Sequence, residues 1–532
     1  MANILIQGGT VYDGSGGVPE QADVLIRDGV VADVGPALSC EGARIIDARG
    51  KAVTPGFVDI HRHCDIAPFT QPDFGRIELA QGITTTVVGN CGLAPVPTTD
   101  RWREETYDYI EPVMGAIPHA LRFETYAGYT EALQKAGLPL NFGFLASAGA
   151  IKTAVKGFAK TPYSAAELER AAAYVREAMD AGACGLSLGI MYQPECYSTP
   201  GENAVLARAA AERDGVLCTH IRGEGDSLVE SVREVIGIAD RAGIRLNISH
   251  FKSTDVRNWR DTIFKATDCI EAARARGQEV TADFYPYDGG STTLLSLLPP
   301  SLLEENMADT FARLSTTEGK RTFREELQKT HPKWDNMALS IGWERIVVSS
   351  VTLPRHAAYQ GRSVAELAQR EGYAEPADFA AELMAEESGK VGIIVLSMSP
   401  EDVETVARLP YTALISDALY GGGNPHPRLY GSFPKFLREM VLEKKLMPMQ
   451  TAIHKMTAMP ADRAGLRDRG RIASGMPADV LVFDAAQFKD HAVYQDSRRL
   501  ATGMDWVLMG GEPVWESGLV SSQRSGRVLR RS

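Results

Sequence analysis

Short β-rich apolar segments alternate with helical stretches rich in Ala, Glu and Arg through most of the chain. The helical stretches include residues 164–181, 204–213, 226–242 and 262–276. Such alternation favours βα units and a parallel sheet. The predicted strands are residues 57–63, 84–91, 141–145, 185–188, 216–221, 245–251, 280–285 and 413–417. Eight strands over about 400 residues predict an α/β fold, a (β/α)8 TIM-like barrel with insertions.

The two ends of the chain share a second pattern, strand, glycine turn and strand. It occurs in Ile4-Leu-Ile-Gln-Gly-Gly-Thr-Val-Tyr12 and around the Asp28-Gly29 hairpin signal. It returns in Trp506-Val-Leu-Met-Gly-Gly-Glu-Pro-Val514. We therefore expect one small β-sandwich domain built from both termini. The expected division is residues 1–56 and 467–532 for this domain and residues 57–466 for the barrel.

The stretch from residue 289 to residue 344 breaks the βα rhythm. It carries Pro299-Pro300, two helical pieces and Trp334. We interpret it as an insertion after the seventh strand that forms a lid over the barrel mouth. Residues 345–351 and 392–396 also resemble strands, so the numbering of the last barrel strands stays open.

Composition narrows the class of protein. The 532 residues are 44% hydrophobic and 23% charged, as in ordinary soluble domains. A formal net charge of −12 disfavours nucleic acid as a partner, because phosphate binding needs a basic face. The N-terminal segment lacks the pattern of a signal peptide, and no apolar run approaches the roughly 18 residues of a membrane span. Seven irregularly spaced cysteines without a CxxC pair argue against a disulfide framework and favour a reducing cytoplasm.

Metal-ligating side chains gather at the ends of the predicted strands, where barrel active sites lie. His61 and His63 end the first strand, and period-2 alternation places both imidazoles on one face. The other strand ends carry Cys91, His220, His250 and Asp417. Imidazole, thiolate and carboxylate donors suit Zn²⁺. One such residue alone is more often a packed core residue, but six in one layer indicate a metal site.

Longer motifs give these residues a family context. Pro55-Gly-Phe-Val-Asp-Ile-His-Arg-His63 resembles the first-strand motif of the amidohydrolase superfamily. The stretches Gly89-Asn-Cys-Gly92, Ser249-His-Phe-Lys252, Tyr285-Pro-Tyr-Asp-Gly-Gly-Ser-Thr292 and His426-Pro-Arg-Leu-Tyr-Gly-Ser-Phe-Pro434 resemble its D-aminoacylase (N-acyl-D-amino-acid deacylase) branch. The similarity runs through nearly the whole chain. A cysteine ligand in place of a carboxylated lysine is the specific mark of that branch.

The resemblance implies a zinc-dependent hydrolase of the N-acyl amide bond of N-acyl-D-amino acids. It implies one tight zinc on Cys91, His220 and His250, and a second, weaker site on His61, His63 and Asp417. Lys252 and Arg428 match positions that hold the substrate carboxylate, and Tyr285 and Ser291 match residues that line the pocket. Asp417 would then move the proton between water and the leaving nitrogen, and Tyr285 would donate to the oxyanion. Tyr287 competes for the role given to Tyr285.

The chain departs from the family pattern beside the metal motif. Arg62 stands between the two histidines where a small residue is usual, and Cys64 follows them. Alternation turns both side chains off the metal face. The stretch Ile66–Phe74, with two prolines, is also unusual and is expected beside the pocket, so the sequence predicts an unusual substrate.

Two other functions remain open on the sequence. One is hydrolysis of a cyclic amide, as in the hydantoinase and dihydroorotase relatives; Cys91 disfavours it. The other is a catalytically inactive scaffold, which the retention of all six ligands disfavours. The expected partner is a small acylated amino acid or related amide, and the oligomeric state stays open, a homo-oligomer included.

Overall fold

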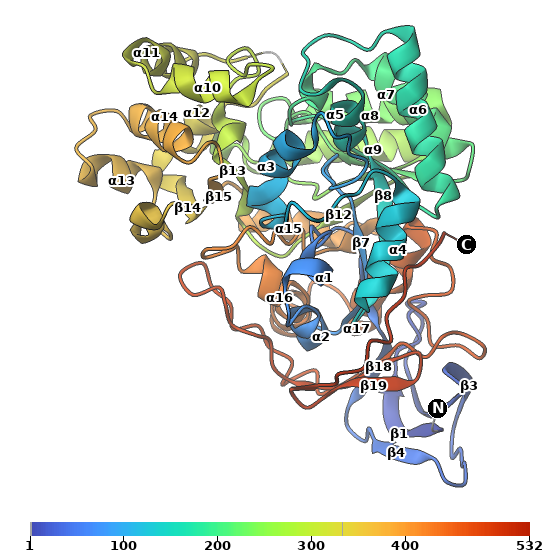
Figure 1. Cartoon of the computed structure of the whole chain (residues 1–532). Coiled ribbons are helices and arrows are strands. Elements are labelled where there is room, and N and C mark those ends of the chain that lie inside the picture. Colours follow the sequence, from blue (N-terminus) through green and yellow to red (C-terminus); the bar gives the residue numbers. More distant parts are fainter. Residues whose placement is uncertain (1–2, 332, 532) are drawn as a thin grey trace.

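The computed structural model describes residues 3–331 and 333–531. Its centre is an eight-stranded parallel sheet in the order β16-β12-β11-β10-β9-β8-β7-β6 (Figure 1). All eight predicted strands are present, which confirms the predicted barrel. The strands are β6 Phe57–Asp59, β7 Ile83–Val88, β8 Asn141–Ser147, β9 Gly185–Gly189, β10 Val216–His220, β11 Arg245–Ile248, β12 Val280–Phe284 and β16 Thr412–Leu414.

The barrel closes between the first and last of these strands. The backbone N–H of Asp417 donates to the carbonyl of His61 at 2.9 Å, and that of His63 donates to Ala418 at 3.0 Å. Arg62 and Ala418 form a parallel bridge. The seam therefore runs through the residues that were predicted to bind metal.

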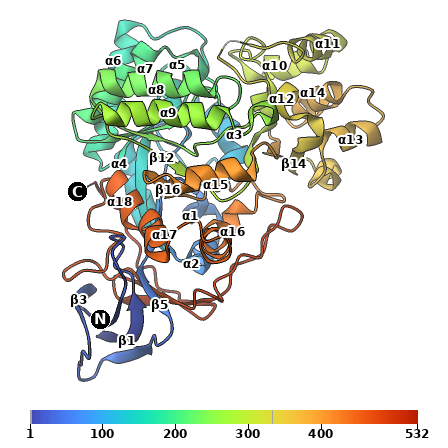
Figure 2. The same ribbon diagram turned by 180° about the vertical axis from the view of Figure 1, so that it is seen from behind.

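Helices cover the outside of the barrel because each presents an apolar stripe to the strands. In α8, Leu228, Val232, Val235 and Ala239 are buried at helical spacing, while Arg233 is exposed. Figure 2 shows α8 and α9 in front of the sheet, beside α6 and α7. The barrel helices are α1 Ala67–Thr70, α2 Arg76–Ala80, α3 Arg103–Met114, α4 Tyr126–Ala136, α5 Ala148–Lys156, α6 Ala165–Asp180, α7 Pro200–Ala211, α8 Leu228–Ala242, α9 Thr262–Ala275, α15 Pro400–Arg408, α16 Arg428–Lys435, the π-helix η6 Phe436–Glu443, α17 Met449–Met456 and α18 Ala458–Arg463.

Strands from both ends of the chain form one nine-stranded sheet, which confirms the composite β domain. Its central contact is antiparallel pairing of β5 with β17, in which Pro55 pairs with Val480. Ile6, Val24 and Val482 belong to its core. The strands are β1 Ile4–Val11, β2 Glu20–Arg27, β3 Val30–Gly35, β4 Arg44–Asp47, β5 Ala52–Pro55, β17 Val480–Phe483, β18 Met504–Met509, β19 Glu512–Glu516 and β20 Leu519–Val520. The domain bounds given above stay a prediction.

A lobe with its own apolar core follows the strand β12. Its antiparallel sheet has the order β13-β15-β14, so residues 345–351 and 392–396 belong to the lobe and not to the barrel. Figure 1 shows the lobe, coloured yellow to gold, beside the barrel. The predicted insertion, 289–344, covers its first part, and we propose that the insertion runs on to β15. Its elements are β13 Gly290–Thr293, α10 Met307–Leu314, α11 Thr317–Glu326, α12 Met337–Ile341, β14 Ile346–Ser350, α13 Val364–Arg370, α14 Pro376–Glu386 and β15 Gly392–Val395.

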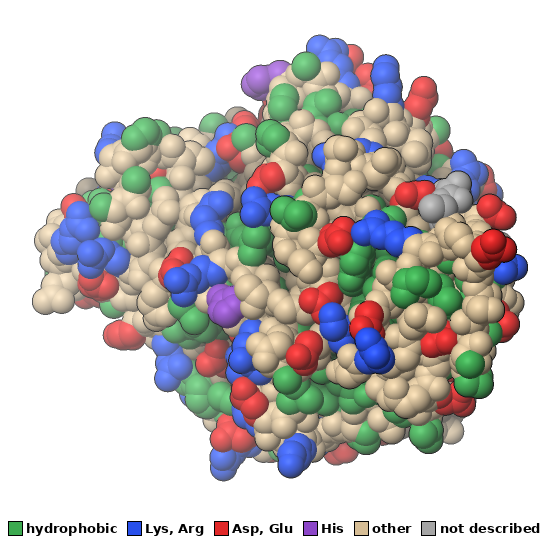
Figure 3. Space-filling view, turned by 90° about the horizontal axis from the view of Figure 1, so that it is seen from below, with side chains coloured by type: hydrophobic (Ala, Val, Ile, Leu, Met, Phe, Trp, Pro, Cys, Tyr) green, Lys and Arg blue, Asp and Glu red, His purple; other side chains and the backbone are tan. Residues whose placement is uncertain are grey.

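The surface agrees with the composition. Basic and acidic side chains are interspersed over the face seen in Figure 3, so the negative charge is not gathered there into one patch. Within residues 3–331 and 333–531, the structure contains no helix of the length and apolarity that crossing a bilayer requires. All seven cysteines are free thiols.

Close packing of neighbouring barrel strands gives a stability prediction. A methyl group on Gly185 in β9 would overlap the backbone carbonyl of Val216 in β10. We expect Gly185→Ala to destabilise the protein by about 1–3 kcal/mol or more, because backbone atoms cannot move aside. The matched control is Gly237→Ala in α8, where nothing lies within 4 Å of the added methyl. That change should stabilise by about 0.5–1 kcal/mol. Thermal denaturation at a fixed heating rate measures both, and equal midpoints would contradict the prediction.

Candidate metal centre and active site

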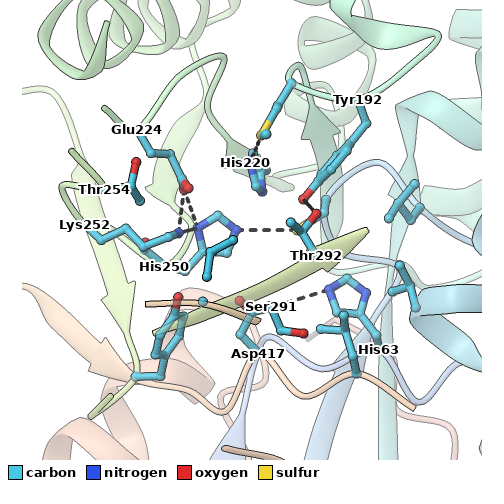
Figure 4. A pocket seen from close by; sticks show the side chains of 18 of the residues that line it. His63, Tyr192, His220, Glu224, His250, Lys252, Thr254, Ser291, Thr292 and Asp417 are labelled. Atoms are coloured by element: carbon cyan, nitrogen blue, oxygen red, sulfur yellow. Dashed lines mark hydrogen bonds and ion pairs between the residues drawn. The ribbon is translucent and has the colours of Figure 1, made fainter. Parts of the chain in front are cut away.

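Five strand ends deliver six buried donor side chains to one place. His61 and His63 follow β6, Cys91 follows β7, and His220 ends β10. His250 and Asp417 follow β11 and β16. Figure 4 shows His63, His220, His250 and Asp417 converging on one pocket. Donor atoms lie within 4.8 Å of one another in three overlapping groups: His61, His63 and Cys91; Cys91, His220 and His250; His61, His250 and Asp417. The structure thus brings together all six predicted ligands.

The spacing of these atoms fits a small cation. Cys91 Sγ lies 3.2 Å from His61 Nε2 and 3.6 Å from His250 Nε2. Asp417 Oδ1 lies 3.4 Å from His61 Nε2 and 3.5 Å from His63 Nε2. Zinc bonds of about 2.0 Å to nitrogen and about 2.3 Å to sulfur place tetrahedral ligand atoms about 3.3–3.5 Å apart. The observed separations are therefore those of ligands that share a metal ion.

The protonation of the cluster also fits a cation. Burial lowers the pKa of His61, His220 and His250 well below the usual histidine value, so the imidazoles are neutral, as ligands must be. Burial raises the pKa of the Cys91 thiol. A nearby metal ion reverses that effect and stabilises the thiolate. The Nδ1 atoms of His61, His63 and His220 are buried without a hydrogen-bond partner among the described residues.

Three of the six donors have a strained backbone. Cys91, His250 and Asp417 have φ angles of +55°, +38° and +49°. Residues other than glycine seldom adopt this region, and each such case costs on the order of 1–3 kcal/mol. The strain turns each side chain from the end of its strand into the pocket. Its concentration at these three positions supports a functional role.

Glu224 is a site residue that the sequence reasoning missed. Its Oε1 lies 2.9 Å from His250 Nδ1 and 2.6 Å from Lys252 Nζ (Figure 4). A carboxylate behind a metal-binding histidine fixes the ring orientation and its tautomer. The available signal was the position of Glu224, in the loop directly after the strand that ends in His220.

The lobe holds the loop that carries Glu224. Asp335 accepts backbone N–H donors from Glu224 at 2.5 Å and from Gly225 at 2.6 Å. It also accepts the hydroxyl of Ser227 at 2.8 Å. The lobe is thereby fixed to the barrel directly beside the metal centre.

The residues that were predicted to bind substrate differ in the partners that already hold their side chains. Arg428 Nη1 lies 2.9 Å from Asp417 Oδ2, and its guanidinium lies 4.7 Å from the centroid of the Tyr285 ring. Lys252 lines the pocket but is held by Glu224 and by the carbonyl of His250. Ser291 also lines it, yet its hydroxyl donates to the carbonyl of Ile393 within the lobe sheet.

Asp417 and Tyr285 have the protonation states that their predicted roles require. Burial is the largest single influence on Asp417 and opposes its ionisation, but the Arg428 guanidinium and the neighbouring imidazoles together hold the pKa of the carboxyl well below its usual range. Burial raises the pKa of Tyr285, which keeps its proton. Its hydroxyl has no hydrogen-bond partner among the described residues. The competing Tyr287 donates its hydroxyl to the carbonyl of Pro427 at 3.3 Å.

Apolar side chains from barrel and lobe complete the pocket. The barrel contributes Leu93, Val113, Met191 and Leu419, and the lobe contributes Met337 and Val395. Tyr192 packs on His220, with ring centroids 4.7 Å apart, and was also missed from the sequence. The two unusual residues of the first motif lie outside the pocket lining: Arg62 is fully buried, and Cys64 Sγ faces Thr86 Oγ1 at 3.9 Å.

Comparison with known proteins agrees with this geometry. Residues 44–294 and 325–515 match the model of the amidohydrolase family. The chain is 32% identical to an N-acyl-D-glutamate deacylase of Alcaligenes xylosoxydans xylosoxydans over 99% of this chain and 96% of that protein. It is 29% identical to a D-aminoacylase of the same organism over 100% and 98%. It is 31% identical to an N-acyl-D-aspartate deacylase of that organism over 99% and 95%.

Two solved structures that are similar to this chain in sequence are also deacylases of this kind. The N-acyl-D-glutamate deacylase of Bordetella bronchiseptica, complexed with zinc and a phosphonate mimic of the tetrahedral intermediate, superposes with a TM-score of 0.84 at 30% identity, covering 99% of each chain. A D-aminoacylase structure gives 0.82 at 28% identity, also covering 99% of each chain. D-hydantoinase shares the fold at 16% identity with a TM-score of 0.55, covering 100% of this chain and 99% of that one.

Metal content tests the centre directly. We expect Cys91→Ala to weaken zinc binding by more than the roughly 10- to 100-fold that loss of a partner behind a ligand costs, because a thiolate ligand is removed. Cys218→Ala removes an equally buried thiol from β10 and should leave zinc content unchanged. Elemental analysis after dialysis measures both variants. Equal zinc in Cys91→Ala and the wild type would contradict the ligand assignment.

Proposed function

This chain belongs to the amidohydrolase family, and from that premise we propose that it is a zinc-dependent hydrolase of N-acyl-D-amino acids. The observation that carries the proposal is the buried cluster of Cys91, His220 and His250 joined through His61 to Asp417. Relatives of similar length that act on N-acyl-D-amino acids support the substrate class.

We propose that Cys91, His220 and His250 hold the tighter zinc, and that His61, His63 and Asp417 form a second, weaker site. Work on a related D-aminoacylase describes a binuclear metal centre with one-metal activation and second-metal attenuation. When bound, zinc would supply a Lewis acid for the amide carbonyl and would lower the pKa of its water to about 7. The residues around it must then orient the substrate and move the proton.

Asp417 is the proposed general base and acid. Arg428 keeps it ionised, which is the form that accepts a proton from the attacking water. As the C–N bond breaks, the same carboxyl would deliver that proton to the leaving nitrogen, which departs as the amine. The hydroxyl of Tyr285, protonated and without a partner among the described residues, is free to donate to the oxygen that gains charge.

Arg428 is the proposed anchor for the α-carboxylate of the substrate. Its Nε is buried and has no hydrogen-bond partner within residues 3–331 and 333–531, while Nη2 donates weakly to the carbonyl of Ser291 at 3.3 Å. A guanidinium with free N–H groups binds a carboxylate by charge-assisted hydrogen bonds. Lys252 lies near enough to assist, with its Nζ 5.8 Å from the centroid of the Tyr285 ring.

The charges that line the pocket favour an uncharged substrate side chain. Arg222 is paired with Glu234 through two contacts of 2.8 and 2.9 Å, and Lys252 is paired with Glu224. Arg428 is also paired, with Asp417 at 2.9 Å, but among the described lining residues it keeps an Nε donor without a partner, which can serve one substrate carboxylate. We propose that the substrate side chain is apolar, although two of the similar relatives act on acidic amino acids.

A substrate panel tests this specificity. We expect N-acetyl-D-leucine or N-acetyl-D-methionine to be hydrolysed with a kcat/KM roughly 100-fold or more above N-acetyl-D-glutamate and N-acetyl-D-aspartate. A second carboxylate buried without a partner costs about 3–5 kcal/mol. The L-enantiomers and hydantoins are the controls for stereochemistry and for the cyclic-amide function. Faster turnover of the acidic substrates would refute the side-chain assignment, and turnover of hydantoins alone would refute the linear amide.

Replacement of the proposed base tests the mechanism. We expect Asp417→Asn to lower kcat by about 10²- to 10⁴-fold, because an amide cannot carry the proton. The tight zinc on Cys91, His220 and His250 should remain. Asp479→Asn, in a buried carboxylate of the composite sheet region, serves as the control and should change stability but not kcat. An Asp417→Asn enzyme with wild-type kcat would remove this role.

A further inference from the structure

Arg62 stands between two proposed metal ligands and points away from both. It lies in the tract His61-Arg62-His63, is fully buried, and has 0% of its surface exposed. A buried guanidinium is expensive unless each N–H group finds an acceptor. The contacts of Arg62 therefore indicate which segments this buried cation holds together behind the proposed metal centre.

All three nitrogens of the Arg62 guanidinium are engaged. Nε donates to Tyr420 Oη at 2.9 Å. Nη1 donates to Ser416 Oγ at 2.9 Å and to Asp59 Oδ2 at 3.4 Å. Nη2 donates to Glu78 Oε1 at 2.8 Å and to the carbonyl of Leu429 at 3.3 Å. One side chain thereby joins β6, α2, the end of β16 and α16.

Two of these acceptors are the sequence neighbours of proposed catalytic and substrate-binding residues. Ser416 precedes Asp417, and Leu429 follows Arg428, so the guanidinium contacts both segments that carry the Asp417–Arg428 pair. Arg62 is itself flanked by His61 and His63. A shift of this one group would displace four site residues together.

Two carboxylates contact the guanidinium and brace the same seam. Glu78 accepts the hydroxyl of Tyr420 and, through Oε2, the N–H of Gly75 at 3.0 Å. Asp59 Oδ1 accepts the N–H groups of His61 at 3.3 Å and of Ser416 at 3.1 Å. Both carboxylates are almost fully buried. Planar, forked guanidinium contacts fix direction as well as distance, which a lysine in the same place does not.

We propose that Arg62 is a positioning residue that sets the separation of His61, His63 and Asp417 across the barrel seam, and so controls the weaker zinc site and the aim of Asp417. The inference rests on the zinc centre proposed above. It also assigns a function to the residue at which the chain departs from its family pattern: the seam is held by a buried ion network in place of a small residue.

The test compares folded variants by metal binding and by kinetics. Arg62→Met removes the fork, Arg62→Lys keeps the charge, and Tyr420→Phe removes one acceptor while leaving every charge in place. Arg469→Met is the matched control, because Arg469 is a buried arginine paired with Asp479 at 3.4 Å, near the composite sheet. Circular dichroism and the thermal midpoint establish that each variant is folded. Zinc is then titrated into metal-free protein against a chelating indicator, and kcat and KM are measured separately.

We expect the tight zinc to be unchanged in Arg62→Met and the weaker zinc affinity to fall about tenfold or more, as for other partners behind metal ligands. The fall in kcat should exceed any change in KM. Arg62→Lys should recover part of the loss, and Tyr420→Phe should shift the same quantities in the same direction by less. Arg469→Met should lower the thermal midpoint and leave both zinc affinities and kcat at wild-type values. If Arg62→Met does not fold, Tyr420→Phe decides the question alone.

Two results would overturn the inference. One is wild-type weak-site affinity and kcat in folded Arg62→Met or Tyr420→Phe; the other is the same loss in Arg469→Met, which would mean general destabilisation. Both leave the proposed function intact, because wild-type zinc binding and turnover are measured in the same series. Wild-type protein that binds no zinc would instead remove the metal centre and this inference with it.

Discussion

The whole site depends on the burial of six ionisable donor side chains close to one another. Burial pushes the thiol of Cys91 and the imidazoles of His61, His220 and His250 toward their neutral forms. Without a bound metal, this cluster stabilises the fold poorly. The Nδ1 atoms of His61, His63 and His220 are buried without hydrogen-bond partners among the described residues, and such atoms cost free energy of folding. The proposed zinc would supply the positive charge that these donors lack. The positive φ angles at Cys91, His250 and Asp417 cost conformational free energy, and they occur where donor side chains point into the pocket.

The parts of the fold that follow from local pattern could be predicted from the sequence, and those that depend on distant contacts could not. The eight strands and the donors at their ends follow from alternation and from the geometry of a barrel. By contrast, the position of Glu224 after the strand of His220 places it near the site but does not indicate that its carboxylate lies behind His250. The acceptors of Arg62 come from residues as far apart as Glu78 and Leu429. The strands β14 and β15 have the same apolar pattern as barrel strands, and only their pairing with β13 assigns them to the lobe.

Overall identity and pocket chemistry answer different questions about substrate. Relatives with 29–32% identity include deacylases of glutamate and aspartate derivatives and a D-aminoacylase, so similarity of this degree identifies the reaction and not the side chain. The pairing of charges in the pocket distinguishes between substrate side chains better than whole-chain identity does. Arg222 is neutralised by Glu234, and Lys252 by Glu224, while the lobe adds Met337 and Val395. Such differences arise from a few side chains that whole-chain similarity hardly weighs.

The pairing of β5 with β17 has a consequence for how the chain is made. The central contact of the composite sheet cannot form until residue 480, the partner of residue 55, has been synthesised. Because the ribosome adds about 5–20 residues per second, this delay lasts for tens of seconds. For that interval the strands β1 to β5 present an open edge of the kind that invites association with other chains. The barrel segment lies between β5 and β17 in the sequence, so Asp417, which makes its closing contact with His61, is synthesised before residue 480. Yield in a host cell should therefore respond to chaperones that shield nascent β-strands more than to any change in the catalytic pocket.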